Sequence, residues 1–250
     1  MVIENKNTFQ ARVQPHFAPS ELLDIKLAYC LAKFGHRAQT RHELNEDGTP
    51  TRYFEHVRRT AIILMDEMKI MDRDMIIAAI LHDSLEDCRD LTPELLEHSF
   101  GSDVVHIIKL LSKVPKVGYL DRLKECHEWK VLAIKACDRL DNLRSLMIPE
   151  NSVDFKQRQL KETADLYFPI FDELLQLVPI SYHRNVSRIV KQIKSLVKGY
   201  RKQLNLEERA RRRALCISCQ GTGYSFWHSE ENYTVCNVCQ GSGKNKELIV

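Results

Sequence analysis

The stretch Met75–Asp87, MIIAAILHDSLED, decides how this chain folds, because seven apolar residues are followed at once by charged ones. A run without any polar side chain predicts a helix that is buried on all sides. If that helix continues, residues four apart share a face, which pairs His82 with Glu86 and Asp83 with Asp87. Since a buried charge is costly unless it is paired or bound to a metal, the rest of the chain must supply a partner for this cluster.

Two further stretches place polar side chains in apolar surroundings. Asp138 lies in VLAIKACDRLDNL with Asn142 one turn later, and His56 lies near the start of YFEHVRRTAIIL. Each residue alone has an ordinary explanation, such as a core histidine bonded to a carbonyl or an aspartate in a buried salt bridge with an arginine. Together with His82 and Asp83 they form a nitrogen and oxygen donor set, on three helices, that suits Mn²⁺, Zn²⁺ or Fe²⁺.

Helical periodicity covers most of the chain and predicts an all-α body. Residues 1–18 are expected to be irregular, and no alternating strand pattern precedes Tyr224. The expected helices lie at about 21–41 with Ser20 as the cap, 53–69, 72–86, a short segment capped by Thr92, 102–113, 118–146, 154–178 and 183–210.

Length and composition limit the class of protein. The chain has 250 residues, of which 44% are hydrophobic, which is enough for one well-buried domain and an accessory element. A net charge of +3 excludes a polycation as a whole. The polar start, MVIENKNTFQ, does not predict a signal peptide, and no apolar run is long enough to span a membrane. We therefore expect a cytoplasmic protein.

The eight cysteines fall into two groups. Four are scattered through helical sequence, where small buried side chains are expected. The other four form two CxxC pairs within the copies CISCQGTG and CNVCQGSG, namely Cys216, Cys219, Cys236 and Cys239. Four thiolates at this spacing predict a closed tetrahedral Zn²⁺ site, with disulfides as the weaker alternative in a reducing compartment. The copies resemble one zinc module of the DnaJ-type cysteine-rich region, and this resemblance does not transfer chaperone function.

A basic segment precedes the cysteine pairs. Residues 184–213 contain eleven lysines and arginines against two acids. The pattern fits a solvated helix face, and it also fits a contact with RNA, the ribosome or another anion, to which aromatic residues of the zinc ribbon would add stacking. We expect a phosphohydrolase domain at 1–182, a basic helical linker at 183–213 and a zinc ribbon with its tail at 214–250. The sequence allows a homo-oligomer without specifying one.

The order of the polar motifs resembles a known family. From about Tyr29 to Leu174 the chain contains, in order, GHRAQTRH, FEHV, LHDSLEDC, LSKV, CDRLDNLRSL and KETADLYFPIF. They include the H…HD…D signature of the HD phosphohydrolase superfamily, and the full series resembles the hydrolase domain of RelA/SpoT-type enzymes, which remove the 3′-pyrophosphate from (p)ppGpp. The resemblance implies an all-α HD-domain fold, here with a small C-terminal zinc ribbon. Because no synthetase domain follows, we expect a small stand-alone hydrolase.

The resemblance also implies roles for individual residues. The ligands of Mn²⁺ or another divalent metal would be His56, His82, Asp83 and Asp138. The carboxylates that activate or orient the attacking water would be Glu86 and Asp87. The substrate contacts would be Arg41 on a phosphate, and Asn142 and Ser145 on the nucleotide.

Three positions and the length of one loop depart from the family pattern. His42 replaces the lysine after Arg41, the loop before His56 is longer, Cys88 replaces a threonine, and Asp141 replaces a histidine. We interpret these changes as surrounding the substrate more than the metal, so strict guanine specificity is not implied. Two alternatives stay open: hydrolysis of another nucleotide, such as an adenine alarmone or a phosphorylated dinucleotide, and a regulatory protein that binds nucleic acid or the ribosome and uses the HD domain as a sensor.

The cysteine spacing leads to a first prediction. Cys216→Ser combined with Cys219→Ser should release about one zinc per chain, because two of the four thiolates are lost. The metal content is measured by atomic emission after dialysis. If residues 184–213 and the ribbon bind RNA, the wild type should show binding that weakens steeply with salt, and the variant should lose it. Full zinc retention would contradict the four-cysteine site.

Overall fold

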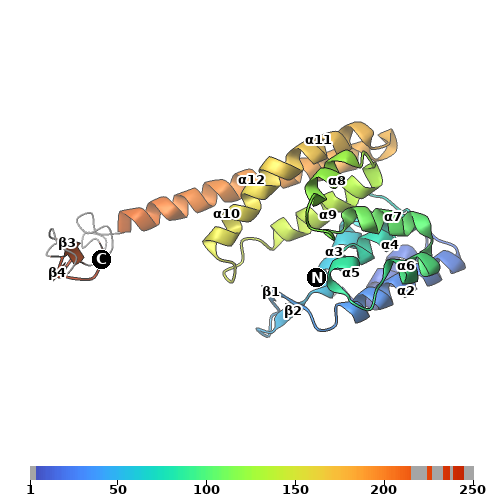
Figure 1. Ribbon diagram of the computed structural model, residues 1–250, viewed down its shortest axis with the longest axis horizontal. Coiled ribbons are helices and arrows are strands. Elements are labelled where there is room, and N and C mark those ends of the chain that lie inside the picture. The colour runs from blue at the N-terminus through green and yellow to red at the C-terminus, as the bar shows by residue number, and fades with distance from the viewer. Residues whose placement is uncertain (1–3, 215–223, 227–232, 237–238, 245–250) are drawn as a thin grey trace. The chain divides into compact units, whose positions relative to one another are not determined.

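The computed structural model describes residues 4–214, 224–226, 233–236 and 239–244, and it divides the chain into compact units at 1–197 and 198–250 (Figure 1). The first unit is helical apart from one hairpin. Its elements are α1 (Lys6–Val13), α2 (Pro19–Gly35), β1 (Thr40–Leu44), β2 (Pro50–Arg52), α3 (Phe54–Ile62), η1 (Ile63–Glu67), α4 (Arg73–Leu81), α5 (Ser84–Asp87), α6 (Pro93–Phe100), α7 (Ser102–Leu111), α8 (Tyr119–Glu125), α9 (Trp129–Arg144), α10 (Val153–Glu162), η2 (Thr163–Tyr167), α11 (Phe168–Leu177) and the first part of α12 (Ile180–Ala214).

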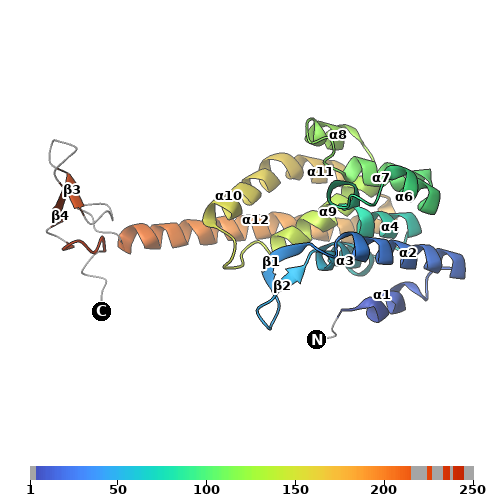
Figure 2. The same cartoon turned by 60° about the horizontal axis from the view of Figure 1, so that its bottom comes forward.

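Helix α4 is the centre of this unit. It packs against α2, α3, α7 and α9, which surround it in both views (Figures 1 and 2). All seven residues of its apolar run, 75–81, have no exposed surface. The prediction of a fully buried helix is therefore confirmed. Burial of large aliphatic side chains, at roughly 1.5–3 kcal/mol each, makes α4 a major source of stability.

The charged end of this stretch differs from the expectation. Helix α4 ends at Leu81, α5 begins at Ser84, and His82 and Asp83 form the turn between them. The prediction of one helix over 72–86 was therefore wrong, and the pairing of residues four apart on a continuous face does not hold. In a turn, adjacent side chains need not point about 100° apart as they do in a helix, and here both His82 and Asp83 are buried.

A β-hairpin replaces the end of the helix expected over 21–41. Helix α2 ends at Gly35, where an added Cβ would lie 2.6 Å from the Cys88 sulfur, so close packing requires glycine. Strands β1 and β2 pair antiparallel with Thr40 opposite Arg52. Their turn contains Gly48 at φ 80°, a conformation that favours glycine. Sequence periodicity missed this hairpin because its strands are short and mostly exposed.

Several other boundaries also differ. Residues expected to be irregular form α1, which Asn5 caps through the amides of Asn7 and Thr8. Ala18, not Ser20, is the N-cap of α2. The helix expected at 118–146 is divided into α8 and α9, whereas the helix expected at 154–178 is continuous from Val153 to Leu177 with the π-helical turn η2 inside it. The cap at Thr92 is confirmed by its bond from the Leu95 amide. Of the scattered cysteines, Cys88 and Cys137 are buried, Cys126 is half-buried and Cys30 is exposed.

Helix α12 is amphipathic within the first unit. Its apolar side chains are buried, namely Val186, Ile189, Val190, Ile193 and Val197. Its basic side chains Arg184, Arg188 and Lys191 are exposed. Contact of this basic face with RNA, the ribosome or another anion stays a prediction.

The second unit, taken by itself, contains the end of α12 and strands β3 (Tyr224–Phe226) and β4 (Tyr233–Val235), which pair antiparallel. Cys236 and Cys239 are buried, and the turn after them has positive φ at Gly241 and Gly243. Cys216 and Cys219 lie outside the described residues. Among the parts of the chain that are described, no helix combines the length and hydrophobicity that a membrane span requires.

The burial of α4 generates a second prediction. Ile77→Ala should lower the free energy of unfolding by about 2–5 kcal/mol, because it opens a cavity in a closely packed core. Ile180→Ala is the matched control, since Ile180 is 90% exposed and its truncation should change stability by less than about 0.5 kcal/mol. Urea denaturation followed by circular dichroism measures both. Equal effects of the two changes would contradict the central position of α4.

Candidate metal centre and adjoining cavity

Three helices bring two histidines and an aspartate together. His56 of α3, His82 after α4 and Asp138 of α9 each place one donor atom within 4.8 Å of the others, and all three are buried. His56 Nε2 lies 3.2 Å from Asp138 Oδ1. Asp83 also belongs to the group, because its Oδ2 lies 3.0 Å from His82 Nε2 and 3.6 Å from His56 Nε2. The structure thus assembles all four residues that the sequence singled out.

The outer nitrogens of both histidines fix the ring orientation. His82 Nδ1 lies 2.9 Å from the carbonyl oxygen of Ala79, and His56 Nδ1 lies 2.7 Å from Asp141 Oδ2. Both partners can only accept, so each Nδ1 carries the proton and each Nε2 presents a lone pair to the cluster when the ring is neutral. His82 Nε2 is buried and makes no hydrogen bond of good geometry, although Asp83 Oδ2 lies 3.0 Å away. Lone pairs and carboxylates that converge in this way fit a divalent cation.

The electrostatics of the cluster favour a cation in the same place. Burial alone would lower the pKa of His82, but the carboxylates of Asp83 and Asp138 raise it to about 9. Burial would raise the pKa of Asp83, yet the charge of His82 holds it well below its ordinary value. The negative potential that stabilises an imidazolium here would also stabilise a bound metal ion.

The carboxylates are held by partners on their other sides. Asp138 Oδ2 accepts from Lys135 Nζ at 2.7 Å, and its Oδ1 accepts from Asn142 Nδ2 at 2.6 Å. The buried salt bridge considered as an ordinary explanation for Asp138 is therefore present, with a lysine in place of an arginine. Asp83 Oδ2 accepts from the Tyr53 hydroxyl at 2.7 Å. Burial and the charge of Asp83 raise the pKa of Tyr53, which keeps this donor protonated.

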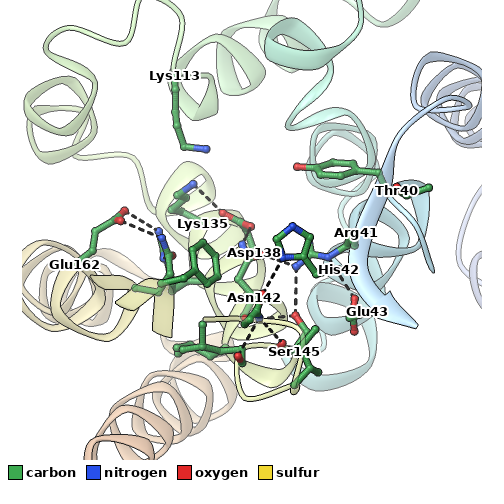
Figure 3. A pocket seen from close by; sticks show the side chains of 18 of the residues that line it. Thr40, Arg41, His42, Glu43, Lys113, Lys135, Asp138, Asn142, Ser145 and Glu162 are labelled. Carbon is green, nitrogen blue, oxygen red and sulfur yellow. Dashed lines mark hydrogen bonds and ion pairs between the residues drawn. The ribbon is translucent and has the colours of Figure 1, made fainter. Parts of the chain in front are cut away.

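A cavity of about 500 Å³ adjoins the cluster, and Asp138 belongs to both (Figure 3). Its lining is rich in cations, namely Arg41, Lys113, Lys116, Lys135 and Arg139. The acids in the lining are Glu43, Asp138 and Glu162. A concave site with an excess of positive charge beside a metal cluster suits a polyanionic ligand.

The three residues expected to contact the substrate meet in this cavity. Arg41 Nη2 donates to Asn142 Oδ1 at 2.9 Å and to Ser145 Oγ at 3.2 Å, as Figure 3 shows. The β1–β2 hairpin carries Arg41, and α9 and its C-terminal turn carry Asn142 and Ser145. His42 also lines the cavity, where its Nδ1 bonds with Asn151 Oδ1 at 2.9 Å.

The two carboxylates expected to activate water lie on α5. The Glu86 carboxylate accepts from the Lys113 amide at 2.7 Å and lies 3.5 Å from Lys113 Nζ. Burial raises the pKa of Glu86 against the opposing charge of Lys113. Partial burial and the charge of Asp83 raise the pKa of Asp87. A carboxylate with a raised pKa is better matched to proton transfer near neutral pH.

Sequence reasoning missed some residues of the site and misplaced one. Lys135 was missed, although a lysine three positions before Asp138 in an apolar run is itself a detectable anomaly. Asp141 was expected near the substrate, but it contacts the metal-cluster histidine His56 and the guanidinium of Arg59 at 2.6 Å. Residues 59 and 141 are far apart in sequence, so no local signal pointed to this pair.

The fold and site define a helical protein with a site for a divalent metal. Residues 36–174, more than half of the chain, match the sequence profile described as HD domain. The chain belongs to the HD domain family.

Similar proteins share this part of the chain. A guanosine-3′,5′-bis(diphosphate) 3′-pyrophosphohydrolase of Vibrio cholerae is 30% identical over 76% of this chain and 28% of its own length. The bifunctional (p)ppGpp synthase/hydrolase SpoT of Escherichia coli (strain K12) is 28% identical over 77% of this chain and 29% of its own length. The chain therefore spans less than a third of the length of these relatives.

A solved structure is also similar. It was described under the words "A metazoan ortholog of SpoT hydrolyzes ppGpp and plays a role in starvation responses". The match has a TM-score of 0.54 and 25% sequence identity, and it covers 68% of this chain and 93% of that one.

The cluster geometry generates a third prediction. Asp83→Ala should weaken Mn²⁺ binding by more than about 100-fold, since loss of a ligand exceeds the 10- to 100-fold cost of losing a supporting group. Asp90→Ala is the matched control, because Asp90 is an exposed aspartate seven residues later. Mn²⁺ binding is followed by electron paramagnetic resonance of the free ion. Unchanged affinity in Asp83→Ala would remove Asp83 from the ligand set.

Proposed function

We propose that this chain is a metal-dependent hydrolase that removes the 3′-pyrophosphate from a (p)ppGpp-type nucleotide. The observation that carries the proposal is the shared position of Asp138, which faces the histidines through one oxygen and lines the cation-rich cavity. A nucleotide in this cavity would place its phosphates beside the cluster. The names of the similar proteins from Vibrio cholerae and Escherichia coli support this class of substrate.

The donor set favours Mn²⁺ at the cluster, with His56, His82, Asp83 and Asp138 as its ligands. A bound divalent cation lowers the pKa of a coordinated water and offsets charge on phosphoryl oxygens. The proposed Zn²⁺ ribbon is separate from this chemistry, and the buried Cys236 and Cys239 support it.

The side chains of the cavity and of α5, which does not line the cavity, divide the remaining work. Water attacks the phosphorus that is bonded to the 3′ oxygen, the bond between them breaks, and pyrophosphate is released. Glu86 and Asp87, with their raised pKa values, accept the proton of the water and return one to the 3′ oxygen that leaves. Arg41 and Lys113 bind the phosphate oxygens and offset the charge that develops on them.

The base of the nucleotide is less constrained than its phosphates. The cavity also has apolar lining from Leu146, Ile148 and Phe155, which suits a nucleobase without selecting guanine. An adenine alarmone or a phosphorylated dinucleotide is therefore the second candidate substrate. His42, which stands in place of the lysine of the family motif and bonds with Asn151, favours keeping this candidate.

A nucleotide panel provides the fourth prediction. Purified protein with Mn²⁺ should convert ppGpp to GDP and pyrophosphate, as resolved by ion-exchange chromatography. Arg41→Gln should lower kcat/KM by roughly 10- to 100-fold, because a hydrogen bond to a charged group contributes about 1.5–3 kcal/mol.

Arg37→Gln is the matched control for that experiment. Arg37 is exposed, lies four residues before Arg41 and is absent from the cavity lining, so kcat/KM should stay unchanged. Faster hydrolysis of the adenine counterpart than of ppGpp would favour the second candidate substrate. Failure to hydrolyse any phosphorylated nucleotide would leave the HD domain as a sensor.

A further inference from the structure

We propose that Asp141 is a positioning residue that orients His56 for the metal, in a charge network that also holds Arg41. This inference rests on the metal cluster of the proposed function and concerns residues outside its ligand set. Asp141 occupies the position where the family motif has a histidine, and Arg59 and Glu43 complete the network.

The contact between Asp141 and His56 decides which nitrogen faces the cluster. Asp141 is only 2% exposed, and its Oδ2 lies 2.7 Å from His56 Nδ1. An ionised carboxylate accepts hydrogen bonds and cannot donate, so the imidazole proton stays on Nδ1 and the lone pair stays on Nε2. The same bond holds the ring plane and makes the imidazole a stronger donor to a metal.

Arg59 pairs with this carboxylate and holds it in place. The guanidinium donates from Nε to Asp141 Oδ1 at 2.6 Å and from Nη2 to Oδ2 at 3.1 Å. Because this contact uses both oxygens of Asp141, the carboxylate has little freedom to rotate away from His56.

The network continues from Arg59 to the substrate cavity. Arg59 Nη2 also donates to Glu43 Oε2 at 2.8 Å, and the same oxygen lies 3.3 Å from Arg41 Nε. The hairpin that carries Arg41 is therefore tied to the support of a metal ligand. A change at Asp141 should act first on His56 and the cluster, with which it is in direct contact, and the contacts through Arg59 and Glu43 also link it to Arg41.

The test measures Mn²⁺ alone, without nucleotide. The full chain is titrated with Mn²⁺ and the free ion is followed by electron paramagnetic resonance; the difference between wild type and His82→Ala defines binding at the cluster. Asp141→Ala should raise the dissociation constant at the cluster by about 10- to 100-fold, the range for loss of a group that supports a metal ligand. Asp141→Asn keeps an acceptor for Nδ1 and should recover much of that loss.

Arg144→Gln is the matched control for general damage to α9. Arg144 is one turn from Asp141 and forms an exposed ion pair with Glu67, so its loss should leave Mn²⁺ affinity unchanged. Thermal unfolding of each variant is measured in parallel. Asp141→Ala that stays folded and binds Mn²⁺ within about twofold of wild type would overturn the proposal, since a lost supporting group costs at least about 10-fold. An equal loss in Arg144→Gln would also overturn it.

Mn²⁺ binding and nucleotide hydrolysis are measured separately, so failure of the role of Asp141 can be told apart from failure of the proposed function. Wild type that binds Mn²⁺ at the cluster but hydrolyses no nucleotide would remove the proposed activity and leave the role of Asp141 intact. Wild type with no more Mn²⁺ binding than His82→Ala would overturn the role of Asp141, whatever the activity.

Discussion

Two histidines and two carboxylates lie close together in the protein interior, and the electrostatic cost of burying them there is the constraint on which the rest of the structure depends. His56, His82, Asp83 and Asp138 converge with their free lone pairs and negative charges directed at one another. Such an arrangement is unfavourable in a protein interior without a compensating cation. Neighbouring donors offset part of this cost: Lys135 Nζ donates to Asp138, and the Tyr53 hydroxyl donates to Asp83.

Helix α4 makes the position of the cluster stable. The apolar run of α4 is buried on every side and carries no charge, and the polar residues begin where the helix ends. The turn at His82 and Asp83 places them beside α3 and α9, which pack directly against α4. Close packing of large apolar residues in α4 then fixes the distances on which metal coordination depends.

The cavity and the cluster share the side chain of Asp138, so an anion bound in the cavity would lie next to the metal site. Asp138 faces the histidines with one oxygen, and that oxygen also accepts from Asn142, whose amide oxygen accepts from Arg41. The segment that matches the HD domain family contains all of these residues. One helical domain, which spans less than a third of the length of the similar bacterial proteins, contains both the cluster and the cavity.

The sequence by itself determined the buried helix, the all-α body and the four residues of the cluster, because apolar runs and buried polar anomalies are local signals. It also indicated Arg41, Asn142 and Ser145, which meet in the cavity. Only the tertiary structure decided the break after Leu81 and the hairpin after α2. It alone placed Asp141 against His56 and Arg59, although the sequence had marked Asp141 as unusual. A contact between residues separated by more than eighty positions depends on how helices pack, and no periodicity along the chain records that packing.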